Sequence, residues 1–261
     1  MLGRWALRIA TLGALAFLYV PIGIIVLYSF NDSRTQTWPI QGFTLKWWEL
    51  AFGNQAAREA LILSIEAGIG ATLIALVLGS LAAFAVHRFR FFGREAISFA
   101  LLLPIALPGI VTGIALSASI DALDLRFSLL TIIIGHATFC VVIIYNNVIA
   151  RLRRTSASLE EASMDLGADA LRTFRHVTLP ALGTAIIAGG LLAFALSFDE
   201  IIVTNFTAGT EQTLPIWILS NIKLPNQRPI VNVVAVVVVV LSVIPVYLAQ
   251  KLAGTEAAGR S

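Results

Sequence analysis

Long apolar runs separated by polar segments dominate this chain. They lie at about residues 6–30, 61–87, 96–120, 127–150, 182–203 and 230–249. Each run is close to or above the roughly 20 residues that a helix needs to cross the hydrocarbon core of a bilayer. Because a helix satisfies its own backbone hydrogen bonds in lipid, the pattern predicts an all-α membrane protein of about six transmembrane helices.

The third run contains a cluster of helix-breaking residues, namely Pro104, Pro108, Gly109 and Gly113. Proline removes one backbone hydrogen bond, so we expect this span to be bent or interrupted. Two interpretations fit the pattern: a helix that lines a transport path and flexes, or a packing kink with close glycine contacts.

Composition agrees with a membrane protein, because 58% of the residues are hydrophobic and only 13% are charged. No low-complexity linker or internal repeat divides the chain. We therefore expect residues 1–254 to form a single membrane domain, followed by a short polar tail at residues 255–261.

The distribution of basic residues predicts the orientation in the membrane. If the N terminus is cytoplasmic, the segments on that side hold twelve of the 18 lysines and arginines, and the opposite side holds six. Cytoplasmic loops carry an excess of these residues, so both termini are expected in the cytoplasm. The same distribution favours membrane orientation over nucleic-acid binding as the meaning of the net charge of +3. The twelve are Arg4, Arg8, Arg88, Arg90, Arg94, Arg151, Arg153, Arg154, Arg172, Arg175, Lys251 and Arg260.

The sequence lacks the motifs of several enzyme classes. It has no GxxxxGK[ST] phosphate-binding loop, no HExxH, no GxSxG and no CxxC. The one cysteine, Cys140, lies inside an apolar run and leaves no intramolecular disulfide possible. We therefore expect a chain that is not an enzyme, holds no metal or cofactor, and hydrolyses no ATP itself.

A polar segment at residues 151–180 is predicted to fold as two short helices. Ser158 and Glu161 have the spacing of a capping box, and Gly167 can end the first helix in a left-handed conformation. Asp169 can cap the second helix. Such a pair can lie in a groove on another protein, while a helix on the lipid surface is the alternative.

The spacing within this segment is similar to a known family pattern. The residues that carry the likeness are Glu161, Ala162, Ser163, Gly167, Val177, Leu179 and Pro180. They resemble the EAA loop of ABC-importer permeases, which reads Glu-Ala-Ala, three residues, Gly, nine residues, Ile, one residue, Leu-Pro. The departures are Ser163 in place of Ala and Val177 in place of Ile.

The resemblance implies the type I (MetI-like) fold of ABC-importer permeases, with residues 1–254 as the permease domain. Residues 151–180 would then be a cytoplasmic coupling loop that docks into a cleft of an ATPase subunit. The residues that the resemblance assigns to coupling are Glu160, Glu161, Ala162, Ser163, Asp165, Leu166, Gly167, Leu179 and Pro180.

The same resemblance implies partners and a location. The expected partners are two cytoplasmic ATPase subunits that use ATP and Mg²⁺, a homologous second permease in a heterodimer, an extracytoplasmic solute-binding protein and membrane lipid. The expected location is the bacterial inner membrane. Further segments are SFN at 29–31, QGFTLKWW at 41–48 and LSFDE at 196–200. They look like the second of the two permease subunits of polyamine importers and imply putrescine or spermidine as the solute.

A few ionisable residues fall inside or near the predicted spans. Asp199 and Glu200 lie near the outer end of the fifth run, where they can attract the ammonium groups of a polyamine. An interface position or a pairing with the partner permease is the alternative. We expect Glu66 to make a buried polar contact and His136 to be a hydrogen-bonded interior histidine.

Two other functions fit parts of the pattern. Six spans with intramembrane charges also suit a secondary transporter or channel that works without ATPases. A scaffold protein whose loop only recruits a partner is a further alternative. The spacing of the coupling loop favours the importer over both.

Overall fold

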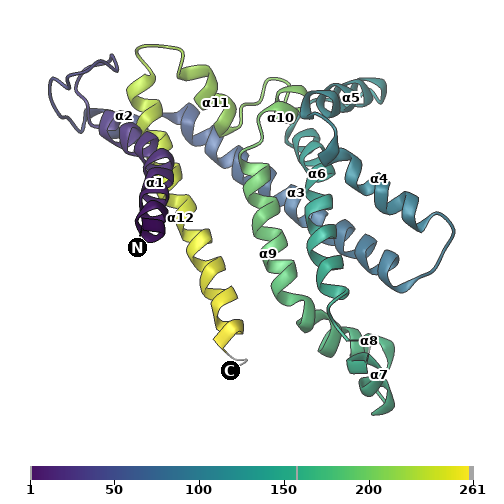
Figure 1. The fold of residues 1–261 in the computed structure, drawn as a ribbon. Coiled ribbons are helices and arrows are strands. Elements are labelled where there is room, and N and C mark those ends of the chain that lie inside the picture. Colours follow the sequence, from purple (N-terminus) through teal and green to yellow (C-terminus); the bar gives the residue numbers. More distant parts are fainter. Residues whose placement is uncertain (1, 157, 259–261) are drawn as a thin grey trace. The chain divides into compact units, whose positions relative to one another are not determined.

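A computed structural model gives the fold and describes residues 2–156 and 158–258, with side chains described for 4–156 and 158–243 (Figure 1). Within those ranges the regular elements are helices, and Asn31 and Phe43 form an isolated antiparallel bridge. The helices are α1 (Leu2–Ser29), α2 (Lys46–Phe52), α3 (Gln55–Arg88), α4 (Arg94–Ala106), α5 (Gly109–Ala122), α6 (Leu129–Leu152), α7 (Ser158–Asp165), α8 (Ala170–Thr173), η1 (Phe174–Thr178), α9 (Leu179–Phe198), α10 (Ile202–Thr207), α11 (Leu214–Asn221) and α12 (Arg228–Ala258).

Most of the predicted spans are single long helices. Four stretches are long and apolar enough to cross a bilayer: Arg4–Ser29, Gln55–Arg88, Leu129–Leu152 and Ala170–Phe198. The pair α4 and α5 makes a fifth if it is counted as one bent span, and the described apolar part of α12 is shorter. The all-α membrane fold expected from the sequence is confirmed.

The third run is broken, as its prolines and glycines predict. α4 and α5 meet at an angle of 104°. Leu107 adopts an extended conformation because the ring of Pro108 disfavours the helical region for the residue before it. Beyond the break, a Cβ at Gly113 would lie 2.4 Å from Phe206 on α10, so glycine permits a close approach there. This contact supports the packing interpretation of the glycines.

The chain divides into two compact units, which are described separately. Unit 1 comprises Met1–Ala60 and Ile216–Val246, and unit 2 comprises Leu61–Pro215 and Tyr247–Ser261. Because α12 continues to Ala258, the first residues of the expected polar tail are helical, and residues 259–261 lie outside the described residues.

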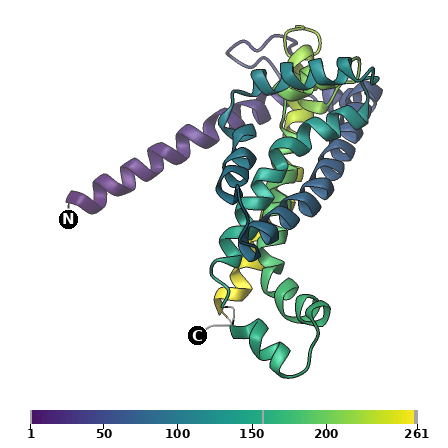
Figure 2. The same cartoon turned by 90° about the vertical axis from the view of Figure 1, so that its right-hand side faces the viewer.

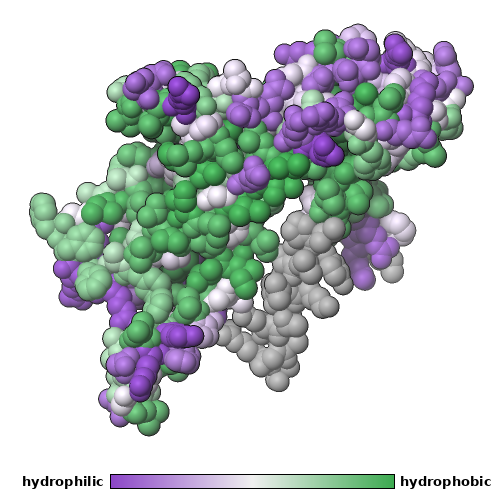
Figure 3. All heavy atoms as spheres, turned by 180° about the vertical axis from the view of Figure 1, so that it is seen from behind, coloured by the Kyte–Doolittle hydropathy of each residue, from purple (hydrophilic) through white to green (hydrophobic). Residues whose placement is uncertain are grey.

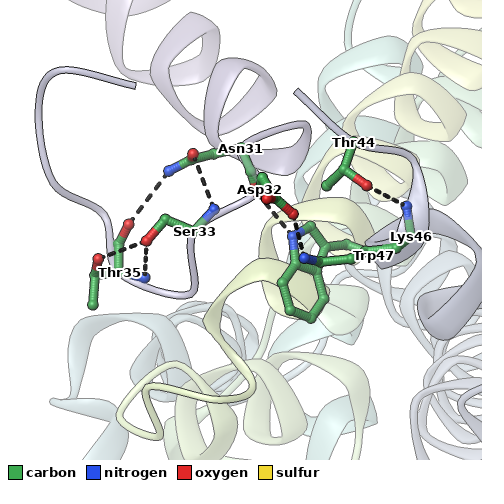
Figure 4. A network of polar contacts seen from close by, with 7 residues as sticks. All are labelled: Asn31, Asp32, Ser33, Thr35, Thr44, Lys46 and Trp47. Carbon is green, nitrogen blue, oxygen red and sulfur yellow. Dashed lines mark hydrogen bonds and ion pairs between the residues drawn. The ribbon is translucent and has the colours of Figure 1, made fainter. Parts of the chain in front are cut away.

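Unit 1 holds a polar network between the end of α1 and the start of α2 (Figure 4). Asn31 is only 1% exposed. Its side-chain oxygen accepts a bond from the Ser33 N–H at 3.2 Å, and its side-chain nitrogen donates to the Thr35 carbonyl at 3.3 Å. The backbone carbonyl oxygen of Asn31 accepts a bond from the indole N–H of Trp47 at 2.8 Å. Lys46 pairs with Asp32 and lies over the Trp47 ring. These bonds hold the start of the loop in one conformation.

Unit 2 is built on close contacts between α3, α6 and α9. Small residues recur at every fourth position of α3, at Ala67, Ala71, Ala75, Gly79 and Ala83. A Cβ at Gly79 would lie 2.8 Å from the Ile144 Cβ and from the Val141 carbonyl oxygen on α6. Small residues in this pattern let two membrane helices approach closely, because little side-chain volume separates the backbones.

The surface and the arrangement of unit 2 suit a membrane protein. Hydrophobic residues cover the long helices, and hydrophilic residues gather on the segment that contains α7 and α8 (Figure 3). Two views agree that α7 and α8 lie at one end of the α6 and α9 pair (Figures 1 and 2). α5 and α10 pack together at the opposite end (Figure 1).

Candidate functional site

The first helix of the predicted coupling segment ends as the sequence indicates. Gly167 has φ +86°, in the left-handed region that glycine enters without steric cost. Its N–H bonds the Met164 carbonyl at 2.9 Å, and the Ala168 N–H bonds the Ser163 carbonyl at 3.2 Å. These two bonds form a Schellman motif, which satisfies carbonyl groups at the end of α7 and turns the chain sharply.

The start of α7 differs from the expected capping box. The helix begins at Ser158 itself, so this serine lies in the first turn instead of ahead of it. The hydroxyl of Ser156 accepts a bond from the Ser158 N–H at 3.3 Å and lies 2.7 Å from the Ser158 hydroxyl. The turn before the helix thus uses Ser156, two residues earlier than expected.

The second helix of the segment runs without interruption into a transmembrane span. Asp169 caps α8, because its carboxylate accepts a bond from the Arg172 N–H at 2.8 Å. One π-helical turn, η1, then joins α8 to α9, with the Leu179 N–H bonded to the Phe174 carbonyl. Since Pro180 has no N–H to donate, the wider turn lies where the α-helical pattern loses a bond. α8, η1 and α9 therefore form one continuous helical stretch, Ala170–Phe198.

Much of the apolar surface of the coupling segment points away from the rest of the chain. Leu166 is 90% exposed and Leu171 is 75% exposed, and Leu159 and Met164 are also exposed. Among the other predicted coupling residues, the exposed ones are Glu161, Ala162, Asp165, Gly167, Leu179 and Pro180. Exposed leucines rimmed by carboxylates are typical of a docking surface.

Two of the predicted coupling residues instead contact this chain. The Ser163 hydroxyl lies 3.0 Å from that of Thr173, which ties α7 to α8. Glu160 turns toward η1 and α3, where its carboxylate meets Thr178 and Arg88. Adjacent positions on a helix point about 100° apart, so Glu160 and Glu161 face different surroundings.

The two carboxylates predicted for the solute path lie at the break between α9 and α10. Asp199 is the exposed C-cap residue of α9. Glu200 is half-buried, and its carboxylate accepts a bond from the Val203 N–H at 2.9 Å. Glu200 therefore stabilises the start of α10, while Asp199 leaves its carboxylate at the surface.

A buried histidine joins α6 to this break. His136 is 1% exposed, with Nδ1 2.7 Å from the Ser197 hydroxyl and Nε2 2.7 Å from the Thr204 hydroxyl. Thr204 donates its own proton to the Glu200 carbonyl, so it must accept from Nε2–H of the ring. In a neutral ring Ser197 then donates to Nδ1, which corresponds to the Nε2–H tautomer. The interior, hydrogen-bonded histidine expected from the sequence is confirmed.

The prediction of a buried contact for Glu66 is wrong. Glu66 is exposed on α3, on the same side as the exposed residues Ile62, Ile69 and Leu73. The reason is that the packing face of α3 is the stripe of small residues, and Ala67 occupies it instead. A carboxylate within an apolar stripe is costly in lipid, so this face is expected to meet protein or water.

A surface cavity of about 510 Å³ lies between α6 and α9 near the α7–α8 end. Its polar lining includes Asn146, Asn147, Arg151 and Arg154. Asn147 donates to the carbonyl of Ile143 on its own helix, at 2.9 Å, and not across helices. Arginines in the lining disfavour a cation there. Within the described part of the chain, no three His, Cys, Asp or Glu side chains gather as a metal site.

Comparison with known proteins identifies the class to which this fold and this segment belong. Residues 75–254 match the family described as the inner membrane component of binding-protein-dependent transport systems. The match covers more than half of the chain, and the chain belongs to this family.

Three individual relatives are permease proteins of spermidine/putrescine or putrescine transport systems. The spermidine/putrescine transport system permease protein PotC of Escherichia coli K12 is 34% identical over 248 residues, covering 94% of this chain and 93% of the relative. PotC of Haemophilus influenzae Rd is 33% identical over 237 residues, covering 90% and 91%. The putrescine transport system permease protein PotI of E. coli K12 is 35% identical over 243 residues, covering 90% and 85%.

A solved structure supports the fold independently. A crystal structure of a bacterial ABC transporter involved in the import of the acidic polysaccharide alginate matches with a TM-score of 0.71. The match covers 97% of this chain and 95% of that chain, at 19% identity. The type I permease fold is confirmed, and this chain is a multi-pass permease subunit of the inner membrane.

Proposed function

We propose that this chain is one permease of an ABC importer for polyamines such as putrescine and spermidine. A homologous second permease would complete the path, two separate ATPase subunits would hydrolyse ATP with Mg²⁺, and a solute-binding protein would deliver the solute. The proposal rests on the exposed apolar surface of α7 and α8, carried by a helix that continues into α9. The names of the relatives supply the solute class.

The α7–α8 end is assigned to the cytoplasm. The excess of lysine and arginine on that side supports this orientation, since cytoplasmic loops retain basic residues. The assignment puts both termini in the cytoplasm and the polar network around Asn31 on the outside. Asp199 and Glu200 then lie toward the outer end of α9.

Docking of α7 into an ATPase cleft would couple ATP hydrolysis to the spans. Burial of Leu166 and Leu171 supplies the affinity, because removing apolar surface from water contributes about 25 cal/mol per Å². Glu161 and Asp165 lie at the rim of this surface, where charge sets the register of docking more than its strength. Closure of the ATPases would move α7 and α8, and α8 would carry that movement into α9.

Electrostatic attraction is the proposed role of Asp199 at the outer end. Its carboxylate is exposed, and polyamines carry several ammonium groups at neutral pH. A fixed negative charge raises the local concentration of such cations and speeds their entry. Glu200 contributes negative charge at the same break while holding α10 in place.

Reconstitution tests the proposed function. The complete complex, with partner permease, ATPases and binding protein, is placed in proteoliposomes, and uptake of labelled putrescine and spermidine is measured with and without ATP. We expect uptake that requires both ATP and the ATPases. Uptake that persists without the ATPases would make this chain a secondary transporter or channel, and ATP-driven uptake of a different solute class would refute the polyamine assignment.

A further inference from the structure

Glu160 is bound on both of its carboxylate oxygens by groups of this chain. One oxygen accepts a bond from the Thr178 hydroxyl at 2.6 Å. The other pairs with the guanidinium of Arg88. The Glu160 side chain is 16% exposed and Thr178 is 2% exposed, so water reaches this carboxylate poorly. Its hydrogen-bonding capacity is used inside the chain.

The three residues belong to three different elements. Glu160 lies in the first turn of α7, Thr178 ends η1, and Arg88 is the last residue of α3. A second contact runs alongside, where the rings of Phe84 on α3 and Phe174 on η1 meet edge to face at 5.4 Å. These contacts fasten the start of α7 to the end of α3 and to η1, which continues into α9.

The covalent route from α7 forward to α9 passes through the turn at Gly167 and α8. α7 connects to α8 through Gly167 and Ala168, and glycine allows more backbone freedom at this point than any other residue. Movement of α7 relative to α8 can therefore be absorbed by the turn. The contacts of Glu160 bypass this turn, because they join the start of α7 directly to the end of η1 and to α3.

We infer that Arg88, Glu160 and Thr178 form a latch that transmits movement of α7 to α3 as well as to α9. In this assignment Glu160 is a positioning residue and not a contact to the ATPase, whereas Glu161 remains on the docking surface. α3 is one continuous helix of 34 residues, so Arg88 is joined to the rest of this span by an unbroken helix. The inference rests on the proposed function, since it assumes that an ATPase moves α7.

The strength of the latch suits transmission more than folding. Arg88 is 45% exposed, and exposed ion pairs contribute little to stability. Fold stability comes instead from the packing of α3 on α6. Removing the latch should leave a folded chain whose α7 moves independently of α3, because the hydrogen bonds that join them are gone.

The test uses the complete reconstituted complex with Glu160→Gln, Arg88→Gln and Thr178→Val. We expect the amount of assembled complex and the rate of ATP hydrolysis to stay near wild type. Uptake of putrescine per ATP hydrolysed should fall severalfold, because α7 and α3 would no longer move together. The double exchange Arg88→Glu with Glu160→Arg should recover part of this ratio, because it restores the opposite charges.

Two matched controls separate the latch from its surroundings. Arg90→Gln removes an exposed arginine two residues beyond Arg88 and should change nothing. Glu161→Gln alters the docking surface, so its effect should fall on ATPase binding and not on the ratio of uptake to hydrolysis.

Several results would overturn the latch. These are an unchanged uptake per ATP in Glu160→Gln and Arg88→Gln, a charge exchange that recovers nothing, or a loss of uptake that only follows a loss of assembled complex. Failure of the wild-type complex to couple ATP to uptake would refute the proposed function itself. If the wild type couples ATP hydrolysis to uptake and the variants couple equally well, only the latch is refuted.

Discussion

Replacing Gly167 with alanine is the most informative single change in the coupling segment. The residue has φ +86°, and nothing lies within 4 Å of a Cβ placed there. The added methyl group therefore meets open space, and the whole effect comes from the backbone conformation. Any loss of function would report on the turn between α7 and α8 and not on packing.

The expected magnitude follows from the left-handed conformation. A residue with a Cβ pays about 1–2 kcal/mol to adopt it. Since 1.4 kcal/mol is a factor of ten in an equilibrium constant, the turn that presents α7 should be populated about tenfold less relative to alternatives. Asparagine tolerates this conformation better than alanine, so Gly167→Asn should have a smaller effect.

The measurement is the affinity of the ATPase subunits for the permease pair in nanodiscs, together with uptake in proteoliposomes. Gly183→Ala is the matched control, because Gly183 lies within α9 with nothing within 4 Å and without a positive φ. We expect ATPase binding to be weakest in Gly167→Ala, intermediate in Gly167→Asn and strongest in the wild type. The control should bind like the wild type. Equal affinity of Gly167→Ala and wild type would refute the role of the turn.

Three further predictions follow from other parts of the chain. Cysteine introduced at Ser156 should resist impermeant labelling from outside intact cells, since the basic residues favour a cytoplasmic location for this segment; labelling from outside would contradict the proposed topology. Asp199→Asn should slow putrescine uptake strongly at low salt and less at high salt. Glu200→Gln should slow uptake in the same way and also loosen the start of α10. Wild-type uptake in the double variant would leave both carboxylates with a structural role only. Gly79→Ala should lower the midpoint of thermal unfolding in detergent, because overpacking against α6 costs about 1–3 kcal/mol, and Gly23→Ala, which has open space around it, should not.

The spans and the coupling segment follow from local sequence rules. Apolar runs of sufficient length predict membrane helices because lipid leaves few other structures possible. The break at Pro108 and the left-handed turn at Gly167 were predictable for a similar reason, since each depends on the backbone preference of one residue. Such features need no knowledge of the neighbouring helices.

The features that the sequence did not predict depend on which face of a helix meets which neighbour. Glu66 and Ala67 are adjacent, yet one is exposed and the other is in the core of unit 2. Nearly every position of α3 around them is apolar, so periodicity could not separate the faces. The small residues recurring at every fourth position of α3 were the one signal that could have done so.

Long-range polar partners are hidden for the same reason. Nothing in the spacing of His136, Ser197 and Thr204 indicates that they meet, because their contacts depend on the packing of α6 against α9 and α10. The inward turn of Glu160 toward Arg88 likewise depends on where α3 ends. The family resemblance assigns both Glu160 and Glu161 to coupling but does not distinguish the directions of their side chains.

The central claim is that ATP hydrolysis in partner subunits drives polyamine transport through this chain by way of α7. The most direct measurement is ATP-dependent uptake of putrescine by the complete complex in proteoliposomes, compared between wild type and Leu166→Asp, which places a charge on the most exposed leucine of the docking surface. We predict that the variant assembles its membrane part normally, binds the ATPases weakly and loses uptake. Wild-type uptake and wild-type ATPase binding in the variant would contradict the account.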